Sequence, residues 1–174
     1  MFYRFKQVWW ALSAQPLNSE DRRLVDELLS SAEKELFYRF SVNDQNHSIR
    51  VVKYNIGKNL KNRSLLKASL LHDIGKTKAG RLSILDRSVA VAIKAVLPSL
   101  SQSWGKRELE EASRFQRPSI VRAQHAEWGA EMVKAAGGDH LTVSLIRRHQ
   151  DMLNKPKTEE ERLLAKLQIA DDLC

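Results

Sequence analysis

Residues 70–76 have the sequence Leu-Leu-His-Asp-Ile-Gly-Lys, which places two strongly polar side chains directly after an apolar run. The preceding residues have helical spacing, and Gly75 is expected to end that helix. Because a buried carboxylate without a partner is costly, Asp73 needs a hydrogen-bonding or ionic partner. Taken alone, the pair favours mutual satisfaction of His72 and Asp73 or bonds to nearby backbone groups. The other interpretation is a metal ion bound in a helical core.

Helical spacing extends over almost the whole chain and predicts an all-α fold. We find no run of apolar–polar alternation and no internal repeat. The 7 glycines and 4 prolines among 174 residues are too few for a sandwich or barrel dense in turns. At roughly 150 residues per domain, the length predicts a single globular domain. We expect about eight or nine helices in it.

Caps, glycines and prolines set the bounds of the expected helices. These cover residues 2–13, 18–40, 43–57, about 62–75, 83–97, 106–117, 123–136, 141–150 and 158–174. The segment 83–97 is expected to be buried and to stop at Pro98. The acidic residues that follow Asn18 and Thr158 suit the positive end of a helix dipole.

The formal net charge of +8 is concentrated in one stretch of the chain. Residues 50–81 contain 9 Lys and Arg against 1 acidic residue. This stretch is either a solvated basic face or a collar for an anionic ligand. The single Cys174 excludes a disulfide framework, and no apolar run approaches the roughly 20 residues of a membrane span. We therefore expect a cytoplasmic protein.

Further histidines and an aspartate have the surroundings of metal ligands. His47 lies on the helix before the His-Asp pair, and Asp171 follows an apolar run on the last helix. Two His and two Asp from three helices can form a site for a divalent metal. His125 and His149 add two imidazoles, although each alone is more often a surface or capping residue.

The order of these residues along the chain is His47, His72-Asp73, His125, His149 and Asp171. This order, with Ile-Gly-Lys after His72-Asp73, resembles the HD superfamily of metal-dependent phosphohydrolases, in the subset with two metals. The resemblance covers about residues 43–172. It implies that residues 43–174 form an all-α HD domain around a metal site. Residues 1–42 lie outside it and are expected to be N-terminal helices that pack on this core.

The resemblance also implies the ligands of each metal. The residues expected to hold the first ion are His47, His72, Asp73 and Asp171. Asp73 would bridge to a second ion that His125 and His149 complete. Asp172 is the main rival of Asp171, which is preferred because it follows an alanine as the family's last acid does. His140 matches no ligand position and is expected on the surface at a helix start. Iron or manganese is the preferred metal, and nickel, cobalt, zinc and magnesium are also compatible.

The implied reaction is hydrolysis of a phosphate ester, with a nucleotide as the favoured class of substrate. Two divalent ions lower the pKa of a bridging water and favour an anionic substrate. Asp73 and Lys76 are the expected catalytic residues, and Lys76 resembles the family's phosphate-contacting lysine. Other basic residues that could face phosphate are Arg50, Lys78, Arg81, Arg147 and Arg148. The chain has no Gly-Tyr-Pro motif, so it matches the cyclic-dinucleotide phosphodiesterases that carry this signature poorly.

Two other functions are compatible with these residues. A di-iron oxygenase can use the same order of ligands, because the metal and substrate decide between redox and hydrolytic chemistry. A non-catalytic module could instead bind a nucleotide or nucleic acid through residues 50–81. We consider nucleic acid a less favoured partner than a small phosphate-containing ligand, because most of the excess of basic residues surrounds His72 and Asp73. The sequence predicts no particular oligomeric state.

Overall fold

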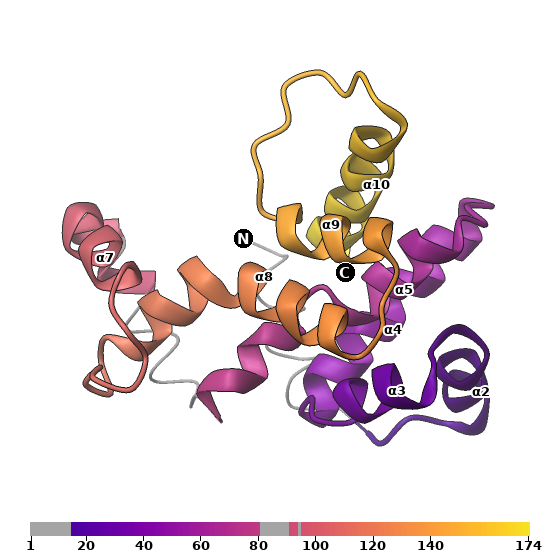
Figure 1. Ribbon diagram of the computed structural model, residues 1–174, viewed down its shortest axis with the longest axis horizontal. Coiled ribbons are helices and arrows are strands. Elements are labelled where there is room, and N and C mark those ends of the chain that lie inside the picture. Colours follow the sequence, from indigo (N-terminus) through magenta and orange to yellow (C-terminus); the bar gives the residue numbers. More distant parts are fainter. Residues whose placement is uncertain (1–14, 81–90, 94) are drawn as a thin grey trace.

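The computed structural model describes residues 15–80, 91–93 and 95–174 (Figure 1). Nine helices have their bounds within these residues, and this part of the chain contains no strand. The prediction of an all-α fold is therefore confirmed. The helix predicted for residues 2–13 lies outside the described residues, as does most of the one predicted for 83–97.

The helices are named in chain order, with η1 denoting a 3-10 helix. Their bounds are α2 Ser19–Leu28, α3 Ser31–Phe37, α4 Val42–Gly57, α5 Arg63–Leu71, η1 Ile74–Ala79, α7 Pro98–Gly105, α8 Arg117–Ala135, α9 His140–Arg148 and α10 Glu159–Leu173. The long helix α8 runs through the middle of the molecule and contacts η1, α9 and α7 (Figure 1). Helices α4 and α5 pack together, and α10 packs on α4, α5 and α9.

The main hydrophobic core joins the helices on both sides of the His72-Asp73 pair. Its fully buried members include Phe37 of α3, Leu70 of α5, Ile146 of α9 and Leu167 of α10. Helices α2 and α3 contact α5, and α3 also contacts α8. The described part of residues 1–42 thus packs on the rest of the chain, while a domain division at residue 42 stays a prediction.

The prediction of one helix over residues 18–40 is wrong. The chain leaves α2 after Leu28, and Ser30 then caps a second helix, α3. The Ser30 hydroxyl accepts a hydrogen bond from the N–H of Glu33 at 3.3 Å, and the Glu33 carboxylate accepts one from the N–H of Ser30 at 2.8 Å. This reciprocal capping box stabilises a helix start inside a segment whose apolar spacing looks continuous.

Two prolines mark helix starts that the sequence analysis did not predict. Pro98 begins α7, and Pro118 lies in the first turn of α8, which starts at residue 117 rather than 123. A proline lacks a backbone N–H, so it is well suited to the first helical turn, where that group has no partner. The predicted helix 106–117 is wrong, because residues 106–116 form turns and irregular structure and residue 117 already belongs to α8. The described part of 83–97 includes Val91 and Val96, which are 46% and 75% exposed, so burial is wrong for these residues.

The predicted helix 62–75 is also shorter than expected. Asn62 caps α5, which ends at Leu71, and the chain continues into the 3-10 helix η1. Gly75 in η1 packs directly on the backbone of α8. A Cβ atom at this position would lie 1.9 Å from the carbonyl oxygen of His125 and 2.6 Å from the amide nitrogen of Gly129. Only glycine allows this close contact.

We expect Gly75→Ala to lower the free energy of unfolding by about 3 kcal/mol, because η1 and α8 must separate to make room for the methyl group. Urea denaturation measures the change. The matched control is Gly57→Ala at the end of α4, where a Cβ would have no neighbour within 4 Å. Its effect should stay below about 1 kcal/mol. Equal effects of the two variants would contradict the close η1–α8 contact.

Asp139 caps α9 and connects it to α5. Its Oδ1 accepts hydrogen bonds from the Thr142 N–H at 2.9 Å and the Ser64 hydroxyl at 2.7 Å. Its Oδ2 accepts one from the Thr142 hydroxyl at 2.7 Å. Partial burial opposes the charge, but these hydrogen bonds dominate and lower the pKa of Asp139. The ionised carboxylate therefore stabilises the fold.

We expect Asp139→Ala to lower the free energy of unfolding by about 1 kcal/mol at pH 7. Since the pKa is lower in the folded state, the contribution is present above the unfolded value of about 3.9. It is lost as the pH falls through the folded pKa, so the two proteins should converge in strong acid. Urea denaturation at pH 7 and at low pH measures this. Asp26→Ala, which removes an exposed ion pair with Lys34, serves as control and should change stability little.

Candidate metal centre

His72 and Asp73 lie at the junction of α5 and η1. The N–H of His72 donates to the Ala68 carbonyl at 2.8 Å and ends α5, and Asp73 precedes η1. His72 is fully buried and Asp73 is 6% exposed. The two neighbouring side chains face the same cluster at this junction. His72 Nε2 lies 3.6 Å from Asp73 Oδ2.

Four other helices contribute the remaining side chains of this cluster. His47 comes from α4, His125 from α8, His149 from the end of α9 and Asp171 from α10. Asp171 Oδ1 lies 2.9 Å from His47 Nε2 and 3.3 Å from His72 Nε2. On the other side, Asp73 Oδ1 lies 3.3 Å from His125 Nε2 and 3.8 Å from His149 Nε2. The structure thus brings together all six side chains that the sequence singled out.

Two groups within the cluster have ligand atoms close enough to share an ion. One is His47, His72 and Asp73, and the other is Asp73, His125 and His149. In each group the ligand atoms lie within 4.8 Å of one another. Asp73 belongs to both groups, with Oδ2 near His72 and Oδ1 near the other two imidazoles.

Backbone carbonyls fix the orientation of three of the imidazoles. The Nδ1 atom of His72 lies 3.2 Å from the Ser69 oxygen, and that of His149 lies 2.7 Å from the Ile146 oxygen. His125 Nδ1 lies 2.8 Å from the Val121 oxygen. Since a carbonyl only accepts, each Nδ1 carries the donated proton. The Nε2 atoms therefore face the cluster and can bind a metal ion when they carry no proton, as in metal sites whose histidines bond to a second shell of acceptors.

These nitrogen atoms fit a divalent cation. His125 Nε2 and His149 Nε2 are only 3.2 Å apart, so two lone pairs would face each other when both rings carry their proton on Nδ1. His72 Nε2 is buried and makes no well-aligned hydrogen bond, and its nearest neighbour is a carboxylate oxygen. A cation between these atoms would satisfy the lone pairs and the carboxylates together. Imidazole and carboxylate ligands suit several divalent transition metals.

The electrostatics of the cluster support the same interpretation. Burial, aided by the charge of His72, lowers the pKa of His149 to about 4, so its imidazole is neutral at pH 7. Burial opposes ionisation of Asp73, but Lys76 and His72 hold the pKa of its carboxyl well below the usual range. Burial likewise opposes the charge of Asp171, whose pKa His72 and His47 lower. Neutral imidazoles and ionised carboxylates are the forms that bind metals.

The pKa of His72 shifts upward, opposite to that of His149. Burial alone would lower its pKa, but Asp73 and Asp171 overcome this effect and raise it. A proton and a metal ion therefore compete for the Nε2 atom of His72.

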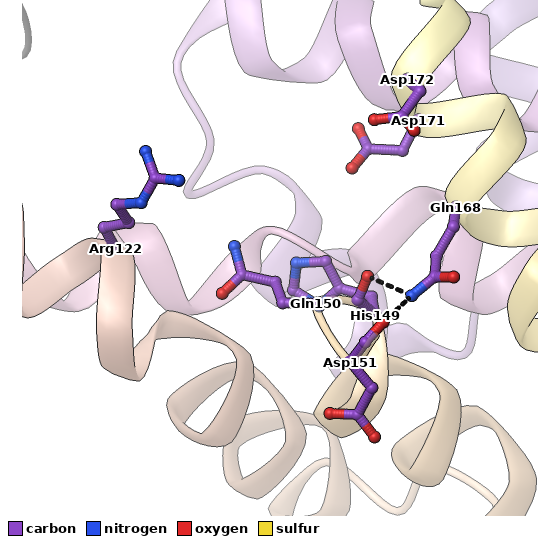
Figure 2. Close-up of a pocket in the computed structure, with 7 residues that line it drawn as sticks. All are labelled: Arg122, His149, Gln150, Asp151, Gln168, Asp171 and Asp172. Carbon is purple, nitrogen blue, oxygen red and sulfur yellow. Dashed lines mark hydrogen bonds between the residues drawn. The ribbon is translucent and has the colours of Figure 1, made fainter. Parts of the chain in front are cut away.

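A cavity of about 460 Å³ borders the cluster. Its lining residues are Arg122, His149, Gln150, Asp151, Gln168, Asp171 and Asp172 (Figure 2). The Gln168 amide donates to the backbone carbonyl of His149 at 3.1 Å and to that of Asp151 at 2.8 Å. These bonds connect α10 to the turn that carries His149. The cavity volume is in the range of small-molecule sites.

Lys76 lies beside the cluster, where the sequence predicted it. Its Nζ donates to Asp73 Oδ2, and its side chain is 41% exposed. Lys78 lies on the same 3-10 helix, but its Nζ is stacked over the Trp128 ring, 4.9 Å from the centroid. Arg81 lies outside the described residues.

The other predicted phosphate contacts have partners on the protein itself. Arg50 Nε donates to the carbonyl of the last residue at 3.2 Å. Arg147 pairs with Glu127 at 3.0 Å, and Arg148 pairs with Glu160 at 2.7 Å. The guanidinium groups of these two arginines are therefore engaged in surface ion pairs. His140 begins α9 and is exposed, as expected.

The sequence analysis missed Arg122 and Gln150 in the cavity wall. The one available signal was that Arg122 precedes His125 by three residues, which places both on one face of a helix. Gln150 follows His149 directly but lies beyond the end of α9, so helical spacing does not predict where its side chain points.

The fold and site define a helical protein with a buried His/Asp cluster at its core that could hold a metal ion. The family model of the HD domain matches residues 45–174, three quarters of the chain. The chain therefore belongs to the HD-domain family. No curated protein and no solved structure matches it. Among the described helices, none is long and apolar enough to cross a membrane.

We expect added Mn²⁺ to raise the melting temperature, because a ligand that binds only the folded state stabilises it by about 2.7 kcal/mol at 100 times its Kd. His149→Ala should greatly reduce the shift. The control is His140→Ala, which removes an exposed histidine from the same helix and should keep the full response. Differential scanning fluorimetry against metal concentration measures both. An identical response of the two variants would contradict the assignment of His149.

Proposed function

We propose that this protein is a metal-dependent phosphohydrolase that acts on a phosphate ester, with nucleotides as the favoured substrates. The observation that carries the proposal is the position of Asp73 between two groups of imidazoles, with one carboxylate oxygen toward each. Membership of the HD-domain family supports it, because this family consists largely of metal-dependent phosphohydrolases.

Two divalent ions fit this arrangement, with Asp73 shared between them. The first would be held by His47, His72, Asp73 and Asp171. His125 and His149 would complete the second. Iron or manganese is favoured, and nickel, cobalt, zinc and magnesium are compatible with the same ligands. When bound, such ions supply an activated water and stabilise negative charge on phosphoryl oxygens.

Asp73 and Lys76 have the clearest roles among the chain's own groups. The Lys76 ammonium orients the Asp73 carboxylate by donating to Oδ2, which leaves Oδ1 directed at His125 and His149. Because Lys76 is also partly exposed, it can donate to a phosphate oxygen at the edge of the site. The ammonium would then neutralise charge that develops on the phosphoryl group.

A screen of the metal-loaded protein tests the proposal. Nucleotides, dinucleoside polyphosphates and cyclic dinucleotides are supplied with Mn²⁺ or Fe²⁺, and release of phosphate or nucleotide is followed. We expect turnover of at least one substrate, and its loss in His72→Ala and Asp73→Asn. Lys76→Ala should lower kcat/KM by about 10–100-fold, as is typical for partners of metal ligands. Lys61→Ala, an exposed lysine in the same basic segment, is the control and should retain full activity.

Two outcomes would contradict the proposal. Oxygen consumption by the iron-loaded protein without hydrolysis of any phosphate ester would indicate an oxygenase. Salt-sensitive nucleotide binding that survives His72→Ala and Asp73→Asn, without turnover in the unchanged protein, would indicate a binding module.

A further inference from the structure

Arg122 is an exposed cation in the wall of the cavity that borders the metal centre. It lies on α8 three residues before His125, which is one helical turn. Within the part of the chain that the structure describes, its guanidinium makes no hydrogen bond or ion pair. This distinguishes it from Arg147 and Arg148, whose charges are balanced by glutamates. A guanidinium in a cavity with its donors available is well suited to an anion.

The cavity has opposite charges at its two sides. Figure 2 shows Arg122 apart from Asp171 and Asp172, with Gln150 and His149 lying between them. The aspartate side belongs to the metal centre, where a phosphoryl group would be bound and hydrolysed. Arg122 lies across the cavity from these aspartates, so a second anionic group of the same molecule could bind beside it.

A second cavity also borders Arg122. It has a volume of about 170 Å³ and lies between α7 and α8, where it is lined by Pro98, Ser101 and Ser119 among others. Arg122 borders both cavities. Space is therefore present on both sides of Arg122, toward the metal centre and toward α7, and a ligand longer than a simple phosphate ester could occupy both.

We propose that Arg122 binds a second phosphate group of the substrate and so selects phosphate esters that carry at least two phosphates. The guanidinium presents two parallel N–H donors to one phosphate, which gives both affinity and orientation. The exposed Gln150 amide lies between Arg122 and the aspartates in Figure 2 and offers a neutral donor. This inference rests on the proposed function, since it places the first phosphate at the metal centre.

The test compares ligands that differ only in the second phosphate. Binding of AMP, ADP and adenosine 3′,5′-bisphosphate to the Mn²⁺-loaded protein is measured by isothermal titration calorimetry. We expect at least one of the two bisphosphorylated nucleotides to bind at least about tenfold more tightly than AMP, as charged hydrogen bonds contribute. In Arg122→Ala this ratio should fall to about twofold or less, and Arg122→Lys should keep part of it, because lysine preserves the charge but not the paired donors.

Lys134→Ala is the matched control. It removes an exposed cation from the same helix outside both cavities, and the ratio should be unchanged. Circular dichroism and bound manganese confirm that each variant is folded and loaded. A ratio near one in the unchanged protein, an equal ratio in Arg122→Ala, or an equal loss of affinity for AMP and the bisphosphates would each overturn the inference. These binding ratios do not require turnover, so failure of the hydrolysis screen is a separate result.

Discussion

The structure depends on an ionised carboxylate, Asp73, that is almost completely buried among imidazoles. Such a charge is tolerated only when cations or donors surround it. Its neighbours are supplied by helices far apart in the sequence, including α8 and the end of α9. The positions of these helices are therefore fixed both by their packing and by the need to surround this charge. A helix that shifted away would remove part of the surroundings that stabilise this buried charge.

The change from α5 to η1 is the local device that meets this constraint. Consecutive residues on an α-helix point about 100° apart, which would direct His72 and Asp73 to different neighbours. The chain leaves the α-helix here: His72 still has helical backbone angles, whereas Asp73 has φ −96° and ψ 2°. Both side chains face one cluster, and Gly75 lets η1 approach the backbone of His125 closely. The geometry of the site therefore depends on backbone contacts as well as on the ligand side chains.

The sequence predicted the helical class and the cluster well, because both leave strong local signals. Polar residues directly after apolar runs identified Asp73 and Asp171, and the order of the histidines completed the set. The predicted helix bounds were wrong where one residue type is compatible with either the start or the end of a helix, or with its interior. Pro98 was interpreted as a helix end although it starts α7, and Ser30 divides a continuous apolar stripe. Phosphate contacts could not be predicted, because charge alone does not tell whether an arginine such as Arg147 faces a cavity or a glutamate.

The amide of Gln168 has a consequence for how this architecture can vary. By bonding to the carbonyls of His149 and Asp151, it fastens α10 to the end of α9 one turn before Asp171. The loop that follows Asp151 begins with Met152, which is 97% exposed, whereas Leu163, Leu164 and Leu167 of α10 lie in the core. An insertion next to Met152 would therefore lengthen the loop without moving Asp171 relative to His149.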